Sequence, residues 1–346
     1  MITKFEQLSN ELILICFSYF NFYELYETFS NLNQRFNHLI QYESKLYINL
    51  DLVPNTKFLT FCLNLNQFIA TSQNYPLSVI AHDKYKLNVI FYDDLFKDKF
   101  SKLKSLTLSN ITIETIYSII FETAAKLYES LRRLSLLDEI STEDKREEDN
   151  NIQKLCNNLI SSKMKSLIYL HLNFEPYRCG CQNDRSSHTY DICLDFKELS
   201  RTENSLSHLE TLIIGGKLFN STHVYNLYRY IEICDDDNYT ISAPTLCFYS
   251  LITDLLPCLP KLKKLIINSI HFIGYYDRRQ YTASSTTTTN LILPLNLKMI
   301  KIWIDNVDGD DDEEENKNLA RNFFINNNLS KTAIIKIFNI EYEKDF

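Results

Sequence analysis

Apolar residues recur at helical spacing throughout residues 5–40. Leu12, Cys16 and Tyr19 follow one another at intervals of four and three, and other apolar residues stand beside them. Two further groups with helical spacing follow, which predicts three short helices in all. A segment of under roughly 40 residues seldom builds a core of its own, and a helix that is apolar on nearly every side is either buried or docked on another surface. We therefore expect the three helices to need a partner.

Capping residues mark the start of each predicted helix. Ser9 belongs to a residue type that caps helices, and it precedes the first group. Asn21 and Glu24 have the spacing of a capping box, in which the two side chains bind each other's backbone amides. Asn31 and Gln34 repeat this spacing before the third group. The three signals predict helix starts directly after residues 9, 21 and 31.

Residues 8–12 (LSNEL), the apolar positions behind them and the Arg35–Phe36 pair resemble an F-box, over about a tenth of the chain. The family usually has Pro at the position of Ser9 and often has Trp at that of Phe36. F-box domains are three-helix modules that insert into the Skp-family subunit of SCF (Skp, cullin, F-box) ubiquitin ligases. The resemblance implies that eight residues meet this adaptor or support those that do: Leu8, Ser9, Leu12, Ile13, Cys16, Phe17, Phe20 and Leu25. In the alternative interpretation, the helices are the first layer of an ordinary helical core.

The pattern changes after residue 45. Residues 46–52 alternate apolar and polar with a period of two and end before Pro54, which predicts a strand. The short segments that follow suit a helix at residues 57–64 and strands at residues 68–71, 77–81 and 89–92.

From residue 103 onward one pattern returns six times, in which an apolar residue is followed by others three and five positions later. This is the LxxLxL core of a leucine-rich repeat. Its copies begin at Leu103, Leu131, Leu167, Leu209, Leu262 and Leu297. Helical patterns lie between several of them, at residues 113–127, 152–160 and 248–256. Because neither element buries its apolar face alone, we expect parallel strands stacked beside a layer of helices.

We predict an α/β fold in two domains. Residues 1–45 form the three-helix F-box-like domain, and residues 46–346 form an irregular leucine-rich-repeat solenoid of parallel strands and helices. The second domain resembles the irregular leucine-rich-repeat domains that commonly follow F-boxes. The unequal spacing of the copies implies insertions, and a non-repetitive, doubly wound α/β domain is the alternative.

A protein substrate is expected on the outward-facing positions of the predicted strands. In a strand with a period of two, the residues that flank the buried leucines point away from the core. In a repeat domain such positions line the concave surface that binds partners. They are Thr107, Ser135, His171, Ile213, Ile266 and Lys301.

Composition indicates a globular protein without a footprint for polyanions. The chain has 346 residues, of which 45% are hydrophobic, enough for a sizeable core. Its net charge of −8 argues against nucleic acid and anionic membranes as partners. The apolar run at residues 12–20 is too short to cross a bilayer, and Glu6 and Glu11 do not suit a secretory signal. Nine cysteines, an odd number, fit reduced thiols in the cytoplasm or the nucleus.

Soft metal ligands cluster at Cys179, Cys181, His188 and Cys193. The residue types suit tetrahedral zinc, but the spacing is Cys-x-Cys in place of the usual Cys-x2–4-Cys, so we expect loop cysteines without a metal. The five glycines do not assemble a phosphate-binding GxxxxGK or GxGxxG loop, and neither HExxH nor GxSxG occurs. We therefore predict no cofactor and no catalytic residue.

Together these patterns predict a binding protein and not an enzyme. With the two resemblances, they imply the substrate-recognition subunit of an SCF-type E3 ubiquitin ligase. The N-terminal helices would dock a Skp-family adaptor, and through it the cullin and RING subunits, while the repeat surface would bind a protein substrate. The alternative is a leucine-rich-repeat interaction scaffold, not linked to ubiquitin ligation, whose N-terminal helices only cap the solenoid.

Overall fold

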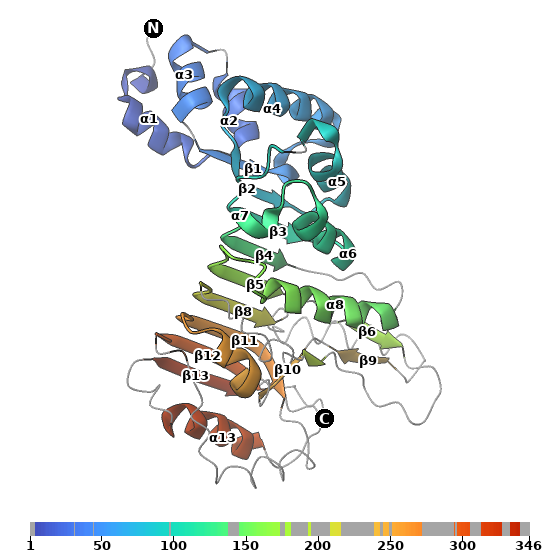
Figure 1. Cartoon of the computed structure of the whole chain (residues 1–346). Coiled ribbons are helices and arrows are strands. Elements are labelled where there is room, and N and C mark those ends of the chain that lie inside the picture. The colour runs from blue at the N-terminus through green and yellow to red at the C-terminus, as the bar shows by residue number, and fades with distance from the viewer. Residues whose placement is uncertain are drawn as a thin grey trace, which may run out of the picture. The chain divides into compact units, whose positions relative to one another are not determined.

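The computed structural model divides the chain into two compact units, Met1–Leu134 and Ser135–Phe346 (Figure 1). The boundary predicted at residue 45 lies inside the first unit. The described residues are 4–30, 32–43, 45–96, 98–137, 145–173, 177–180, 193–194, 208–215, 239–242, 245–248, 251–271, 294, 296–304, 313–326 and 333–339.

The first unit begins with three short helices. They are α1 (Asn10–Phe17), α2 (Phe22–Phe29) and α3 (Gln34–His38), with a 3-10 turn at Lys4–Gln7 before them and a π-helical turn at Leu39–Glu43 after them. The predicted capping box is confirmed at the start of α2. The Glu24 amide donates to Asn21 Oδ1 at 3.1 Å, and the Asn21 amide donates to Glu24 Oε2 at 3.3 Å.

The start predicted for the third helix is wrong by two residues. Asn33, and not Asn31, caps α3, because its Oδ1 accepts a hydrogen bond from the Phe36 amide at 2.9 Å. The cap at Asn33 places Phe36 in the first turn, where its ring packs against Phe17 and Phe29 with centroids 6.2 and 5.9 Å apart. Burial of this ring favours the later start.

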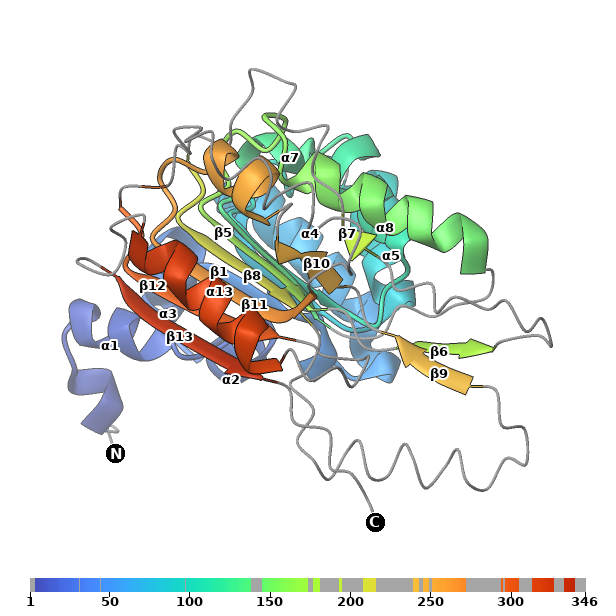
Figure 2. The ribbon, with the colours of Figure 1, turned by 90° about the horizontal axis from the view of Figure 1, so that it is seen from below.

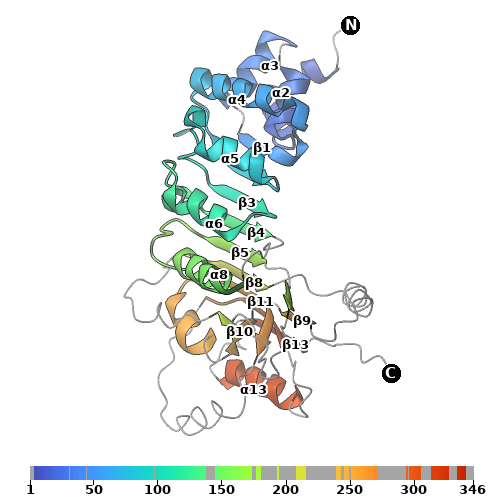
Figure 3. The ribbon, with the colours of Figure 1, turned by 90° about the vertical axis from the view of Figure 1, so that its right-hand side faces the viewer.

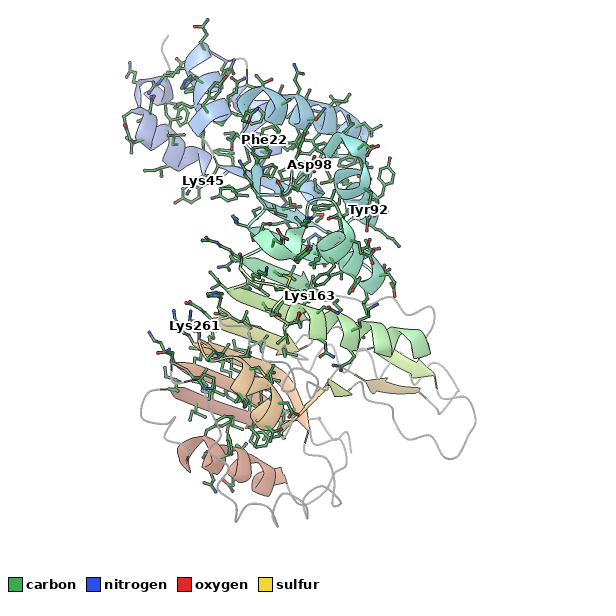
Figure 4. All side chains as sticks on the ribbon, viewed as in Figure 1. Phe22, Lys45, Tyr92, Asp98, Lys163 and Lys261 are labelled. Atoms are coloured by element: carbon green, nitrogen blue, oxygen red, sulfur yellow. The ribbon has the colours of Figure 1, made fainter. Side chains whose placement is uncertain are left out.

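Aromatic rings also join these helices to the chain that follows. Phe22 of α2 contacts Phe61 and Phe68 of α4 (Phe58–Ser72), with ring centroids 6.0 and 4.9 Å apart. Figure 3 shows α2 beside α4, and Phe22 is labelled in Figure 4. One side of the three-helix segment is therefore sealed by the protein's own chain.

The rest of the first unit alternates strands and helices. Its elements are β1 (Leu46–Asn49), 3-10 turns at Leu50–Leu52 and Asn55–Lys57, α4, β2 (Pro76–Ala81), α5 (Lys84–Tyr92), a 3-10 turn at Asp94–Phe96, β3 (Ser105–Ser109), α6 (Ile113–Tyr117), a π-helical turn at Ser118–Glu122 and α7 (Leu127–Ser130). β4 (Arg133–Leu137) begins at its end. β2 pairs in parallel with both β1 and β3.

Three local predictions in this region are wrong. The strand predicted at residues 46–52 ends at Asn49 and continues as a 3-10 turn. The strands predicted at residues 68–71 and 89–92 lie within α4 and α5. Short apolar runs do not separate strand from helix by periodicity. In α4 the buried residues recur at helical intervals along the whole element, so its amphipathic face decides the outcome.

The second unit is built on parallel strands. Its elements are α8 (Lys145–Leu159), β5 (Tyr169–Asn173), β6 (Tyr177–Gly180), β7 (Cys193–Leu194), β8 (Thr211–Gly215), β9 (Tyr239–Ser242), β10 (Thr245–Cys247), a π-helical turn at Leu251–Leu255, a 3-10 turn at Leu256–Cys258, β11 (Lys264–His271), β12 (Met299–Ile304), α13 (Glu313–Asn326) and β13 (Ile334–Asn339). β5, β8, β11, β12 and β13 pair in parallel in this order. β10 joins the end of β11 and pairs with β7, whereas β6 and β9 form an antiparallel pair. α13 packs against β13 (Figure 2).

The six LxxLxL copies coincide with β3, β4, β5, β8, β11 and β12, and all their motif residues are buried. The turn before the strands repeats as well. The carbonyl of the residue after the first leucine accepts hydrogen bonds of 2.8–3.1 Å from two successive amides of the following copy. This arrangement recurs at Lys104, Ile168, Glu210 and Lys263. The predicted α/β class with parallel strands is confirmed.

Candidate protein-binding surfaces

An apolar stripe on α1 faces solvent. Leu12, Ile15 and Tyr19 follow one another at intervals of three and four and are 49%, 56% and 84% exposed. Side chains at these intervals lie on one face of a helix, and Tyr19 stands two residues beyond the end of α1. We call these three residues the α1 stripe. Large apolar side chains grouped in this way are typical of a docking surface.

The opposite face of α1 is sealed. Ile13 and Phe17 are 0% and 2% exposed, and the Phe17 ring lies 5.1 Å from that of Phe29. Leu25 of α2 is buried in the same segment. α1 therefore packs one apolar face in the core of the segment and leaves a second apolar face exposed to solvent.

The structure therefore sorts the eight residues that the F-box resemblance assigned to adaptor binding. Ser9 and Leu12 are exposed, and Leu8, Cys16 and Phe20 are half-buried. The three others are core residues that support the exposed ones: Ile13, Phe17 and Leu25. Ile15 and Tyr19 are exposed beside Leu12 but are missing from the predicted set. Intervals of three and four place them on the same helix face as Leu12, but only the packing of the structure shows that this face is the exposed one.

Arg35 fixes the segment that leads into α1. Its Nη1 donates to the carbonyl of Glu6 at 2.7 Å, and its Nε donates to Asn10 Oδ1 at 2.8 Å. Its Nη2 also donates to the carbonyl of Leu8. A planar guanidinium with several donors holds three acceptors in a fixed arrangement. Arg35, one of the residues on which the resemblance rests, thus positions the start of α1 from α3.

The first turn of α1 is electrostatically favourable. The pKa of the exposed Glu11 carboxyl is lowered by its backbone hydrogen bond, then by a hydrogen bond from Ser9 and by the Arg35 charge. Ser9 stands at the N-cap, but its side chain makes no capping bond to the backbone. The predicted cap position is therefore correct, but the Ser9 hydroxyl hydrogen-bonds the Glu11 carboxylate and not a backbone amide.

A second surface lies on the strands of the second unit. His171, Ile213, Ile266 and Lys301 are successive register partners across β5, β8, β11 and β12, and all four are half-buried. The row continues to Lys336 of β13. Four of the six residues predicted to bind substrate thus form one continuous row. Of the other two, Thr107 is a register partner of Ile80 in the first unit, and Ser135 lies on β4.

The imidazole of His171 is mainly uncharged at neutral pH on this surface. Burial lowers the pKa of its imidazole from the ordinary value of 6.5 because a charged ring loses solvation there. The Tyr169 ring stands edge-on to it with centroids 6.5 Å apart. At pH 7 the row therefore takes its positive charge from lysines and not from this histidine.

Two buried cysteines, Cys62 and Cys156, are not activated. Burial raises the pKa of the Cys62 and Cys156 thiols to about 12, so both stay protonated at neutral pH. Among the described residues no three His, Cys, Asp or Glu side chains are grouped to hold a metal ion. Of the sequence-derived zinc candidates, Cys179 lies in β6 and Cys193 in β7, whereas Cys181 and His188 lie outside the described residues.

The chain is an α/β protein with parallel strands, and its two candidate sites are surfaces on α1 and on the strands of the second unit. No protein-family model matches the chain, and no curated protein matches it. Within the part of the chain that the structure describes, none of the helices combines the length and apolar character needed to cross a bilayer.

Proposed function

We propose that this protein is the substrate-recognition subunit of an SCF-type ubiquitin ligase. The α1 stripe docks a Skp-family adaptor, and the outward face of the second unit's strands binds a protein substrate. One observation carries the proposal: α1 keeps Leu12, Ile15 and Tyr19 exposed although its other face is fully packed. This is the arrangement that an F-box needs, because the helix that meets the adaptor must be folded before it docks.

Burial of the stripe would supply a driving force for association. Full burial of a large apolar side chain is worth about 1.5–3 kcal/mol. Leu32 and Tyr42, in the same three-helix segment, are also more than half exposed. An interface of standard size buries about 1,600 Å² in total. The exposed apolar residues of this segment would form its centre, and the polar residues around them its rim.

The repeated backbone bonds between consecutive LxxLxL copies support an irregular leucine-rich-repeat architecture for the strand-containing part. Four of the copies use the same carbonyl to bind the next copy, although the intervening segments differ in length. A doubly wound sheet does not require this repetition at the turns. A repeat surface suits a receptor because outward positions vary freely while the buried leucines keep the fold.

In this function the chain does no chemistry. The RING subunit and its conjugating enzyme transfer ubiquitin, and this chain raises the effective concentration of a substrate lysine near them. The proposal places the protein in the cytoplasm or the nucleus, where such complexes work.

The test is co-purification with a Skp-family adaptor. We expect Leu12→Asp and Tyr19→Asp to abolish adaptor binding, because a charge on the stripe faces an apolar partner surface. Leu63→Asp is the matched control, since Leu63 of α4 is 59% exposed and lies outside the three helices. Circular dichroism checks that all variants keep their helices. Adaptor binding that survives the double variant Leu12→Asp/Tyr19→Asp would reject the proposal.

A repeat scaffold not linked to ubiquitin is the second candidate. The contacts of Phe22 with Phe61 and Phe68 favour it, because terminal helices that only cap a repeat array would pack on its first elements in this way. In that case the chain captures protein partners through its strands and does not bind a Skp-family adaptor. Deletion of residues 1–41 would then expose the α4 aromatics and lower stability without a loss of any adaptor complex.

A further inference from the structure

The strands of the second unit carry charge of a single sign. β5, β8, β11, β12 and β13 contain no Asp or Glu and three lysines, Lys264, Lys301 and Lys336. Each lysine stands beside a buried residue of the same strand, so all three occupy outward positions. Lys301 and Lys336 are register partners on adjacent strands.

Two like charges at directly opposed positions oppose strand pairing. Adjacent strands lie about 4.8 Å apart, and like charges placed opposite each other are destabilising. In the described segments neither Lys301 nor Lys336 forms an ion pair with an acidic side chain. Lys263, by contrast, precedes β11 and is paired with Glu210 at 2.6 Å. Among the residues that the structure describes, Lys301 and Lys336 therefore have no acidic partner on this face.

Large apolar side chains flank the two lysines along each strand. On β13, Ile334 and Phe338 stand two residues before and after Lys336 and are 56% and 39% exposed. On β12, Trp303 follows Lys301 by the same interval, and its ring stacks on Phe338 with centroids 4.9 Å apart and planes inclined by 21°. A stacked aromatic pair that remains partly exposed beside cationic groups is typical of a binding anchor.

We infer that this face binds an acidic segment of a partner protein, with Asp or Glu carboxylates on Lys264, Lys301 and Lys336 and a large apolar residue on the Trp303–Phe338 pair. The inference deepens the proposed function, since it names the class of substrate that the receptor would recruit. Acidic peptide fits better than nucleic acid, because the chain as a whole has a net charge of −8 and repels long polyanions. The five strands also contain no arginine, the side chain suited to bidentate phosphate binding.

The single tryptophan of the chain lies in this surface and reports on it directly. Trp303 is the only Trp among 346 residues, so its fluorescence reads occupancy of the face in the full-length protein. The probe is a short synthetic peptide that alternates Glu with Leu, and the matched peptide has Gln at every Glu position. We expect the Glu peptide to shift the emission of Trp303 in a saturable way. The Gln peptide should bind with an affinity at least about tenfold lower.

Charge reversal provides the decisive comparison. In the double variant Lys301→Glu/Lys336→Glu we expect the affinity for the Glu peptide to fall about tenfold or more. Lys163→Glu is the control, because Lys163 is an exposed lysine of the second unit outside these strands (Figure 4) and changes the net charge in the same direction. Equal affinity for the Glu and Gln peptides, or unchanged affinity in the double variant, would overturn the inference. A single-stranded oligonucleotide that shifts Trp303 emission as strongly as the Glu peptide would also overturn it.

The inference and the proposed function fail separately. Leu12→Asp removes adaptor binding but leaves the strands of the second unit untouched, so the Glu peptide still binds this variant. If the wild-type chain binds the peptide but no Skp-family adaptor, the ligase function fails and the acidic-segment surface remains. If it binds the adaptor but not the peptide, the reverse holds.

Discussion

The α1 stripe and the outward face of β12 and β13 both expose large apolar side chains, but only the strand face also carries charged residues. The stripe consists of Leu12, Ile15 and Tyr19 and contains no charge. On each of these two strands, one outward lysine stands between outward apolar residues that lie two positions before and after it. The first surface gains affinity by removing apolar area from water, whereas the second adds long-range attraction for anions. A constant partner suits the first kind of surface, and selection among many partners suits the second.

The largest expected effect is on the free energy of unfolding, and it distinguishes the exposed Leu12 of the stripe from the buried Phe17 that supports it. Phe17→Ala should lower the free energy of unfolding of the first unit by about 3–5 kcal/mol, the usual cost of removing a buried Phe ring. Leu12→Ala should change it by less than about 0.5 kcal/mol, because Leu12 is half exposed and makes no comparable packing. Urea denaturation followed by circular dichroism measures both.

These two variants also separate support from contact in adaptor binding. Leu12→Ala should weaken adaptor binding while the protein stays folded, whereas Phe17→Ala should lose binding only to the extent that the helices unfold. The sequence alone does not separate residues that meet the adaptor, such as Leu12, from residues that support them, such as Phe17. Equal stability losses in the two variants would contradict the division of α1 into a bare and a packed face.

The effect of salt on binding affinity should differ between the two surfaces, and this difference is the second largest that we expect. The screening length falls from about 10 Å at 0.1 M to about 3 Å at 1 M ionic strength. We expect the affinity of the Glu peptide for the strands to fall several-fold as salt is raised over this range. Adaptor binding through the α1 stripe should stay constant or strengthen slightly, because burial of apolar area does not depend on screening. Titrations at both salt concentrations test this, and parallel losses for both ligands would remove the distinction.

The strands were predictable because three buried leucines fix both their position and their orientation. Around β5, Leu167, Leu170 and Leu172 predict that His171 faces outward, and the same pattern predicted outward positions for Ile213, Ile266 and Lys301. β13 was missed because it has no leading leucine, with Thr332 at the corresponding position. As a result, Phe338 and its contact with Trp303 had no signal in the sequence.

The helices were less predictable because apolar residues surround them. In α1, Ile13 and Phe17 alternate with Leu12 and Ile15, so periodicity does not reveal which face packs against α2 and α3. The choice between Asn31 and Asn33 as a cap likewise depends on burial of Phe36, which local spacing does not contain. Such features become visible only when distant residues meet.

The smallest effect concerns pH, which should act on the strand surface and leave the stripe unchanged. The pKa of His171 is lowered by burial, so the folded state binds a proton less readily than the unfolded state. The stability that neutral His171 contributes is therefore present above its ordinary pKa of 6.5 and is lost as the pH falls through the lowered value. In His171→Gln this loss is removed, and urea midpoints at about pH 7.5 and about pH 5 should differ less than in the wild type. The control is His208→Gln, the same substitution at an exposed histidine of the same unit. Identical pH dependence in the wild type and His171→Gln would show that His171 is solvated as freely as any surface histidine.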